Sequence, residues 1–469
     1  MSTHAPRRSE GLIDLSAPRR VHVVGAGGPG MSALALLLHG LGHSVTGSDV
    51  REGEAVVQLR SRGISVRVGH DASLVKGADV VTYSTAVPGD NVELEAARSV
   101  GTPVRHRADL LASLCTRMAT MGVAGTHGKT TTTALLDHGL AALGRDQSVL
   151  VGAEVIATGV GAVHRGDSLL LLEADESDGT LDVLPLWGIV VTNLDVDHLD
   201  YFGSFPVMQR SFAALLDRIP GPIVLNADDD GSEPLRRAAP PGRTVTFGVS
   251  EGADVRIVEW SPTPDGLSIR LDVDGGTHSA SVPLRGGHNA ANIAAATAAA
   301  VRLGASAEAF LDALADFGGV ARRFTERARV RGALLVDDYA HLPAEIAASV
   351  AAMRTHPEVT GPVIAVFQPN RYHRVLAMAG DYARCFAGAD SVVITEIYAS
   401  GTPEIAGVSG RLVLDAIATA HPELDLVWAP TREEVVEAVL ARLVPGAGCI
   451  SMGCGDIETL PDDVMGSLR

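Results

Sequence analysis

Residues 120–133 read TMGVAGTHGKTTTT, a stretch that passes from a short apolar run through glycines into a helical pattern. A Walker A loop has the form G-x-x-x-x-G-K-[ST] between a strand and a helix. Val123 stands where the first glycine of that form belongs. The remaining residues of the motif are present: Gly125, Gly128, Lys129 and Thr130. In such a loop backbone N–H groups surround phosphates, the lysine reaches their oxygens and the threonine ligates Mg²⁺. The stretch therefore predicts a phosphate-binding loop in an α/β domain.

The lysine of this loop is unusual within its own chain. Lys129 and Lys76 are the only lysines, and arginine supplies the other 36 of the 38 basic residues. A compact ammonium can point into a ring of backbone amides, where a planar guanidinium does not fit. We therefore interpret Lys129 as a residue that contacts phosphate.

Composition indicates an ordinary globular protein of several domains. A chain of 469 residues is too long for one core, and about three domains are expected. The net charge of -18 argues against nucleic-acid binding. The sequence has no apolar run of about 18 residues, so membrane insertion is not expected. The first residues lack the pattern of a secretion signal, and the four cysteines lack metal-ligand spacing. These features favour a cytoplasmic location.

Short β-branched runs alternate with Ala- and Leu-rich helical stretches, which is typical of parallel α/β sheets. We predict a flexible lead-in at 1–19, a Rossmann-like N-terminal domain at 20–115, a central P-loop ATPase-like domain at 116–318 and a Rossmann-like C-terminal domain at 319–469. Within the central domain the polar stretch 252–282 has the pattern of an antiparallel hairpin.

A second glycine-rich loop occurs near the start of the chain. Gly25, Gly27 and Gly30 form a G-x-G-x-x-G pattern between a predicted strand and a predicted helix. Asp49 ends the next strand, at the spacing of an acid that binds a ribose. The pattern alone leaves three readings open: a nicotinamide or flavin dinucleotide, another diphosphate such as a UDP-sugar, or a tight turn without a ligand.

Polar residues at two later strand ends are candidates for metal binding. Glu173 directly follows the apolar run 169–172, and the carboxyl ends of strands are where α/β proteins collect ligands. The acids just after it, at 175–178, are interpreted mostly as solvent-facing loop charges. Asn193 follows the next strand, and His198 lies just beyond it, as a candidate for a second metal position.

An amide pair marks the start of an alanine-rich helix. His288, Asn289 and Asn292 open this helix, and the two asparagines are three residues apart on one helical face. They could read the edge of an adenine, or Asn289 could cap the helix. Spacing leaves both readings open.

The motifs together resemble the Mur ligase family across nearly the whole chain. They occur in the order GAGGPGMSALA, GTHGKTTT, EADESDGT, NLDVDHLDYF, GGHNAANIAAA, GVARRF, DDYAH, FQP and MGCGDI. The resemblance implies an ATP-dependent ligase that forms an amide bond through an acyl phosphate. The GAGGPGM opening resembles the branch that joins L-alanine to UDP-N-acetylmuramate. It also implies that the first domain binds UDP rather than a dinucleotide.

The resemblance assigns roles residue by residue. The residues implied to contact the UDP-substrate are Gly25, Gly27, Gly28, Gly30, Asp49, Ser84 and Thr85. Those implied to contact ATP are Gly125, Thr126, His127, Gly128, Lys129, Thr130, Thr131, His288, Asn289, Asn292, Arg323 and Asp338. Those implied in catalysis are Lys129, Glu173, His198 and Asn193. Two Mg²⁺ ions, or Mn²⁺ in their place, are implied at Thr130, Glu173 and His198.

The implied amino-acid pocket is where this chain departs from the family pattern. Its residues are Tyr339, His341, Asn370, Arg371 and Arg374. Asn370 replaces the usual histidine and Leu342 replaces a second one. Asparagine cannot carry charge or transfer a proton. A ligase for another amino acid, or a binding-only pseudoenzyme, therefore stays an alternative, as does an oxidoreductase built on the first glycine loop. We expect a monomer or weak homodimer.

Overall fold

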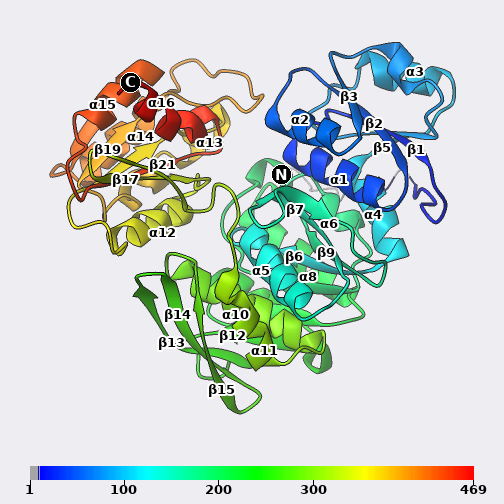
Figure 1. Ribbon diagram of the computed structural model, residues 1–469, viewed down its shortest axis with the longest axis horizontal. Helices are drawn as coiled ribbons and strands as arrows, with labels where there is room; N and C mark the ends of the chain where they lie inside the picture. The colour runs from blue at the N-terminus through cyan, green and yellow to red at the C-terminus, as the bar shows by residue number, and fades with distance from the viewer. Residues whose placement is uncertain (1–8, 10, 469) are drawn as a thin grey trace. The chain divides into compact units, whose positions relative to one another are not determined.

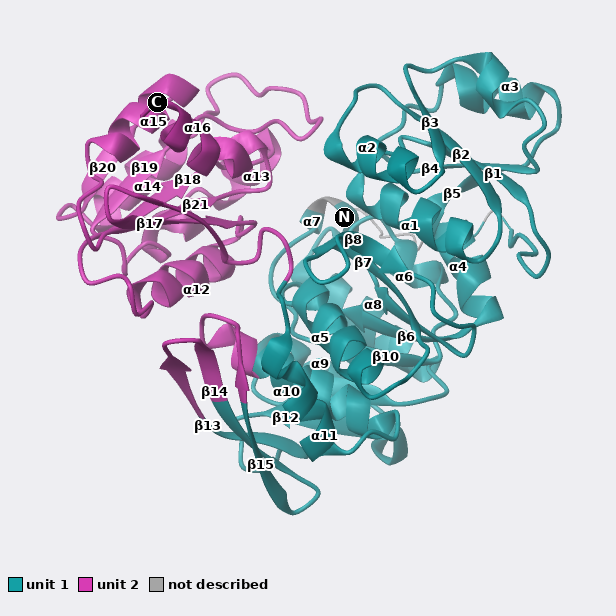
Figure 2. Ribbon diagram, viewed as in Figure 1, with its two compact units in different colours: residues 1–259, 269–280, 291–319 teal, residues 260–268, 281–290, 320–469 magenta. Residues whose placement is uncertain are grey.

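The computed structural model describes residue 9 and residues 11–468, which form two compact units (Figure 2). Unit 1 comprises residues 1–259, 269–280 and 291–319, and unit 2 comprises residues 260–268, 281–290 and 320–469. Of the lead-in predicted at 1–19, residues 1–8 and 10 lie outside the described part of the chain. No helix of the described residues is long and apolar enough to cross a membrane.

The first sheet of unit 1, drawn in blue in Figure 1, has five parallel strands in the order β3-β2-β1-β4-β5. Its strands are β1 (Arg20–Val24), β2 (Ser44–Asp49), β3 (Ser65–Val68), β4 (Val80–Tyr83) and β5 (Val104–His106). Its helices are α1 (Pro29–Gly40), α2 (Glu54–Ser61), α3 (Val92–Ser99) and α4 (Arg107–Arg117). Helices between the strands provide the crossovers that parallel pairing requires.

The second sheet has ten strands in the order β15-β14-β13-β12-β11-β10-β6-β9-β7-β8. Its strands are β6 (Ala119–Ala124), β7 (Ser148–Val155), β8 (Val160–Val163), β9 (Leu169–Glu173), β10 (Gly188–Val191), β11 (Ile223–Asn226), β12 (Thr244–Gly248), β13 (Val255–Thr263), β14 (Gly266–Val273) and β15 (Gly276–Val282). The helices of this region are α5 (Lys129–Ala142), α6 (Thr180–Val183), α7 (Leu199–Phe202), α8 (Phe205–Asp217), α9 (Glu233–Ala238), α10 (His288–Arg302) and α11 (Ala307–Asp312).

The edge of this sheet is a meander, as the polar stretch 252–282 predicted. Two residues connect β13 to β14, and two connect β14 to β15. Connections this short join only antiparallel neighbours. At the opposite edge β7 and β8 also pair antiparallel, whereas the strands between the two edges are parallel.

Unit 2 contains a six-stranded sheet in the order β16-β17-β21-β18-β19-β20, parallel except for the β16–β17 pair. Its strands are β16 (Thr325–Val330), β17 (Ala333–Asp338), β18 (Val363–Phe367), β19 (Ser391–Ile394), β20 (Asp425–Trp428) and β21 (Gly448–Met452). Its helices are α12 (Pro343–Arg354), α13 (Tyr372–Met378), α14 (Arg411–Ala420), α15 (Arg432–Leu440) and α16 (Leu460–Gly466).

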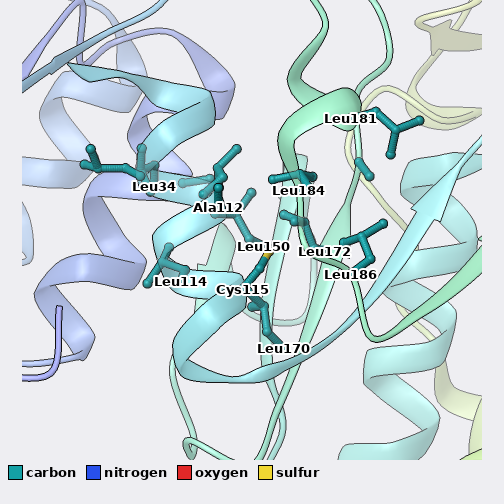
Figure 3. Packing of buried hydrophobic residues seen from close by; sticks show 14 of the residues in the cluster. Leu34, Ala112, Leu114, Cys115, Leu150, Leu170, Leu172, Leu181, Leu184 and Leu186 are labelled. Carbon is teal, nitrogen blue, oxygen red and sulfur yellow. The ribbon is translucent and has the colours of Figure 1, made fainter. Parts of the chain in front are cut away.

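Buried apolar residues fix the two sheets of unit 1 to one another. Leu34 of α1, Leu114 of α4, Leu150 of β7 and Leu170 of β9 belong to one continuous cluster (Figure 3). In unit 2, one cluster packs α12, α13 and α14 on the sheet, and another packs α15 and α16. The predicted fold class, three α/β sheets built mainly from parallel strands, is confirmed.

Candidate functional site

The phosphate loop connects the end of β6 to the start of α5. Gly125 and Gly128 have φ values of +120° and +81°, which favour glycine. A Cβ at Gly128 would collide with the side-chain oxygen of Asn292, and one at Gly125 with the hydroxyl of Thr192. Both glycines are therefore required by backbone conformation and by close packing.

Lys129, the first residue of α5, points back into this loop. Its Nζ donates to the carbonyl oxygen of Gly125 at 2.6 Å and to Oε1 of Glu176 at 2.9 Å. Burial alone would lower the pKa of Lys129, but the carboxylates of Glu176, Asp175 and Glu173 hold it above its ordinary value. The ammonium therefore stays charged where phosphate oxygens would bind.

Glu176 is the residue of this site that the sequence did not identify. It was expected to be a solvent-facing loop charge, but it is 1% exposed and forms an ion pair with Lys129. Its Oε2 has no hydrogen-bond partner among the described residues. The sequence gives no local signal that sets Glu176 apart from the acids beside it. Asp175 and Asp178 pair with Arg107 and not with Lys129.

Thr130 and Glu173 meet at the edge where β9 ends. The Thr130 hydroxyl donates to Oε1 of Glu173 at 2.8 Å, and Oε2 accepts from the N–H of Gly152 at 2.6 Å. Among residues 9 and 11–468, no three His, Cys, Asp or Glu side chains gather as a metal site. Mg²⁺ suits a sparse protein donor set, because it takes one or two carboxylates and completes its shell with water and phosphate. The donor set of Thr130 and Glu173 fits this ion.

His198 lies near the same acids. It precedes α7 with a φ of +52°, a conformation uncommon outside glycine. Its Nε2 is 3.2 Å from Oδ2 of Asp197 and 3.9 Å from Oε1 of Glu176. The fold therefore brings His198 to the acid that pairs with Lys129, and a second metal position at His198 stays a prediction.

Asn193 holds the phosphate loop from the neighbouring strand. Its Oδ1 accepts from the N–H of His127 at 2.9 Å, and its Nδ2 donates to the carbonyl oxygen of His127 at 3.0 Å. Its own carbonyl oxygen accepts from the N–H of Thr126 at 3.0 Å. These contacts make Asn193 a residue that positions the loop.

Thr131, another residue predicted to contact ATP, is buried in the first turn of α5.

The amides of α10 are both buried, and Asn292 contacts α5. Oδ1 of Asn292 accepts from the Thr132 hydroxyl at 3.3 Å, so α10 contacts the phosphate-loop helix at this residue. Nδ2 of Asn289 donates to the carbonyl oxygen of Arg285 at 2.7 Å and lies 3.2 Å from Nε2 of His288. His288 and Asn289 belong to unit 2 and Asn292 to unit 1.

The glycine loop of the first sheet uses its own donors internally. Gly25 and Ala26 donate their N–H groups to the carbonyl oxygen of Ser48, and Gly28 donates to that of Gly25. The carboxylate of Asp49, predicted to bind a ribose, accepts from the N–H of Gly27 at 2.8 Å. Two further predicted residues, Ser84 and Thr85, directly follow β4, the strand that pairs with β1. The loop is thus rigidly closed on itself.

In unit 2, the predicted nucleotide contacts surround Tyr339. The guanidinium of Arg323 lies 5.2 Å from the Tyr339 ring centre, and that of Arg322 lies 5.1 Å from it. Asp338 accepts from the N–H groups of Phe324 and Ala340, each at 2.7 Å. Burial raises the pKa of Asp338 to about 6 and that of Tyr339 to about 12.

The predicted amino-acid residues also lie in unit 2. Asn370 is buried, and its Oδ1 accepts from Nη1 of Arg374 at 3.0 Å. Arg371 has a φ of +61°, and its buried Nε has no hydrogen-bond partner among the described residues. His341 Nδ1 lies 3.2 Å from Oε2 of Glu345. Asn370 thus orients an arginine, a task that needs no proton transfer.

The structure therefore divides the predicted site residues between the units. Unit 1 brings together the phosphate loop, Glu173, His198, Asn193 and Asn292, and it also carries the glycine loop with Asp49. Unit 2 carries Arg323, Asp338 and the five predicted amino-acid residues.

Comparison with known proteins gives matches along most of the chain. Family models described as "Mur ligase family, catalytic domain", "Mur ligase middle domain" and "Mur ligase, glutamate ligase domain" match residues 20–118, 123–300 and 322–455. A UDP-N-acetylmuramate–L-alanine ligase of Bradyrhizobium sp. strain ORS 278 is 40% identical, covering 93% of this chain and 95% of the relative. One from Clavibacter sepedonicus is 38% identical, covering 96% and 94%. The crystal structure of a UDP-N-acetylmuramate–alanine ligase from Thermotoga maritima superposes with a TM-score of 0.79 at 26% identity, covering 96% of this chain and 99% of that one.

Proposed function

The chain belongs to the Mur ligase family of ATP-dependent ligases, and on that premise we propose that it joins L-alanine to the lactyl carboxylate of UDP-N-acetylmuramate. The product is an amide, and ATP is converted to ADP and phosphate. The observation that carries the proposal is the meeting of Lys129, Thr130 and Glu173 at one strand edge. These residues supply the charge and the oxygen donors that phosphoryl transfer requires.

The reaction proceeds in two steps. A carboxylate oxygen of UDP-N-acetylmuramate attacks the γ-phosphorus, the bond to ADP breaks, and an acyl phosphate forms. The amine of alanine then attacks the carbonyl carbon, phosphate leaves, and the amine loses a proton. Both steps depend mainly on positioning and on neutralising charge. No group of this chain needs to form a covalent bond to substrate.

The residues of unit 1 perform the first step. Lys129 holds the transferred phosphate, and Asn193 fixes the backbone of the loop through His127. Mg²⁺, which is general for the family, would be held by Thr130 and Glu173 and would neutralise phosphate charge. A second Mg²⁺ near His198, and the use of Mn²⁺ in its place, are further proposals. Asn292, buried beside α5, is proposed to contact adenine together with Asn289.

Recognition of the amino acid is assigned to residues of unit 2. Arg371 and Arg374 can pair with the α-carboxylate, because a guanidinium binds a carboxylate with two parallel hydrogen bonds. Asn370 accepts from Arg374 and holds it in place. We propose that these residues, with Tyr339 and His341, form the L-alanine site.

An amino-acid panel tests the proposal. Purified chain is incubated with ATP, Mg²⁺ and UDP-N-acetylmuramate, and phosphate release is measured with L-alanine, glycine, L-serine and D-alanine. We expect the highest kcat/KM for L-alanine, with the same preference in Asn370→His. Preference for another amine would show a paralogous ligase, and absence of turnover would show a binding-only protein. We also propose that the protein is cytoplasmic and forms a monomer or a weak homodimer. Sedimentation of the purified chain would test the oligomeric state.

A further inference from the structure

The glycine loop of the first sheet lacks the donors that its proposed ligand needs. The N–H groups of Gly25, Ala26, Gly27 and Gly28 all donate to acceptors within the protein. The acceptor of the Gly27 N–H is the carboxylate of Asp49, a negative charge inside the loop. A diphosphate bound here therefore requires a positive charge from elsewhere in the structure.

Arg107 is placed to supply that charge. It is the first residue of α4, and its side chain reaches the start of α1: a Cβ built on Gly30 would lie 2.9 Å from its Nη1. The glycine at position 30 therefore clears the space that the guanidinium occupies. Any larger side chain would push Arg107 away from the helix start, where an anion is stabilised by the helix dipole.

The nitrogens of Arg107 are divided between two tasks. Nη2 donates to Oδ2 of Asp175 at 2.9 Å and to Oδ2 of Asp178 at 3.0 Å, and Nε lies 3.3 Å from the same Asp178 oxygen. Nη1, the nitrogen nearest Gly30, has no hydrogen-bond partner among the described residues. The two carboxylates thus fix the guanidinium plane and leave one donor edge facing the loop.

We propose that Arg107 is a further substrate-binding residue, which donates from Nη1 to the diphosphate of the UDP-linked substrate. This inference rests on the proposed function, because it assumes that the first sheet binds UDP. Asp175 and Asp178 act as positioning residues for Arg107. Because Lys129 pairs with Glu176 of the same loop, residues 175–178 hold both cations that meet phosphate.

The test compares ligands with and without phosphate. Calorimetric titration of the full chain with UDP and with uridine gives an affinity ratio that reports the phosphate contacts. In Arg107→Gln, UDP binding should weaken about 10- to 100-fold, the usual effect of losing a hydrogen bond to a charged group, while uridine binding stays within about twofold. A merely structural role would weaken both ligands equally.

Arg117→Gln is the matched control, because Arg117 lies at the other end of α4 and pairs with Asp167 at 2.9 Å. It should keep the wild-type ratio. If Arg107→Gln does not fold, Arg107→Lys replaces it and should lower the ratio, because an ammonium lacks the planar fork. An unchanged ratio in the folded Arg107 variant overturns the proposal. A wild-type chain that binds UDP but releases no phosphate with UDP-N-acetylmuramate and L-alanine contradicts the proposed function instead.

Discussion

Replacing Lys129 by methionine is expected to destabilise unit 1, in addition to abolishing catalysis, because the lysine neutralises a buried acid. The two charged atoms lie 2.9 Å apart, and the side-chain exposures are 14% for Lys129 and 0% for Glu176. Without the ammonium, His198, at 3.9 Å, is the one basic side chain among the described residues that still pairs with the Glu176 carboxylate. Removing one partner of a buried pair costs about 3–5 kcal/mol, because the other charge stays uncompensated.

We expect a loss of about 3 kcal/mol for Lys129→Met, the lower end of that range, because the carboxylate can take up a proton. Glu176→Gln should cost less, about 1–2 kcal/mol, since Lys129 keeps the carbonyl oxygen of Gly125 as an acceptor at 2.6 Å. The double variant Lys129→Met/Glu176→Gln buries no charge at this position. It should be more stable than Lys129→Met alone.

The assay is thermal unfolding followed by fluorescence, in parallel with phosphate release. A loss of about 3 kcal/mol lowers the midpoint by at least about 6 °C in a domain of a few hundred residues. Lys76→Met is the matched control, because Lys76 is the only other lysine and is exposed. It should change stability by less than about 0.5 kcal/mol.

Stability and activity should separate in the double variant. Glu176→Gln restores stability to Lys129→Met, but turnover stays reduced by about 100-fold or more, because no charge meets the transferred phosphate. The reasoning is refuted if the double variant is less stable than Lys129→Met. It is also refuted if Lys129→Met unfolds at the wild-type temperature.

Three further substitutions probe the two units. Lys129→Arg should fold but lose at least about 100-fold in turnover, because a guanidinium does not fit the ring of loop amides; wild-type turnover would contradict this. Thr130→Val should raise the Mg²⁺ concentration for half-maximal activity about 10-fold or more, and Thr133→Val, on the same helix, should leave it unchanged. Burial raises the pKa of Asp338 to about 6, so the folded chain keeps a proton that the unfolded chain releases, and stability falls as pH rises from about 4 to about 6. In urea unfolding, the free energy of unfolding of Asp338→Asn should therefore rise relative to that of wild type by up to about 3 kcal/mol between these pH values. A difference between variant and wild type that does not change with pH would argue against the raised pKa.

Most of the parallel strands were predictable because they are short, mainly apolar runs that lead into glycine or a polar residue. The run 169–172, for example, becomes β9, and its C-terminal Glu173 lies beside Thr130 as the edge geometry predicts. The strands β5, β7, β8 and β16 were not predicted. β8 and β16 pair antiparallel at sheet edges, β7 pairs antiparallel with β8 and parallel with β9, and the short edge strand β5 pairs parallel with β4. In these strands polar residues and glycines interrupt the apolar pattern, and pairing depends on distant neighbours.

The roles of polar residues were harder to predict than the strands. Asn193 follows its strand as expected, but its side chain is occupied by the backbone of His127, and this pairing becomes visible only in three dimensions. Asp49 has the spacing of a ribose ligand, yet its carboxylate closes the glycine loop through Gly27. Sequence spacing placed these residues at the correct strand ends without stating what each side chain contacts.

The acidic segment at residues 175–178 shows why local composition was misleading there. Three acids in four residues normally indicate a solvated loop, because unpaired carboxylates are costly to bury. Here Glu176 is buried while Asp175 and Asp178 are half-buried, and two cations from other parts of the chain offset their charges: Arg107 from α4 and Lys129 from the phosphate loop. The pairs span 47 residues or more, so no sequence window reports them. Lys129 lies in the predicted phosphate loop and Arg107 lies against Gly30 of the predicted UDP-binding loop, so the same acidic segment pairs with the cation at each proposed phosphate site.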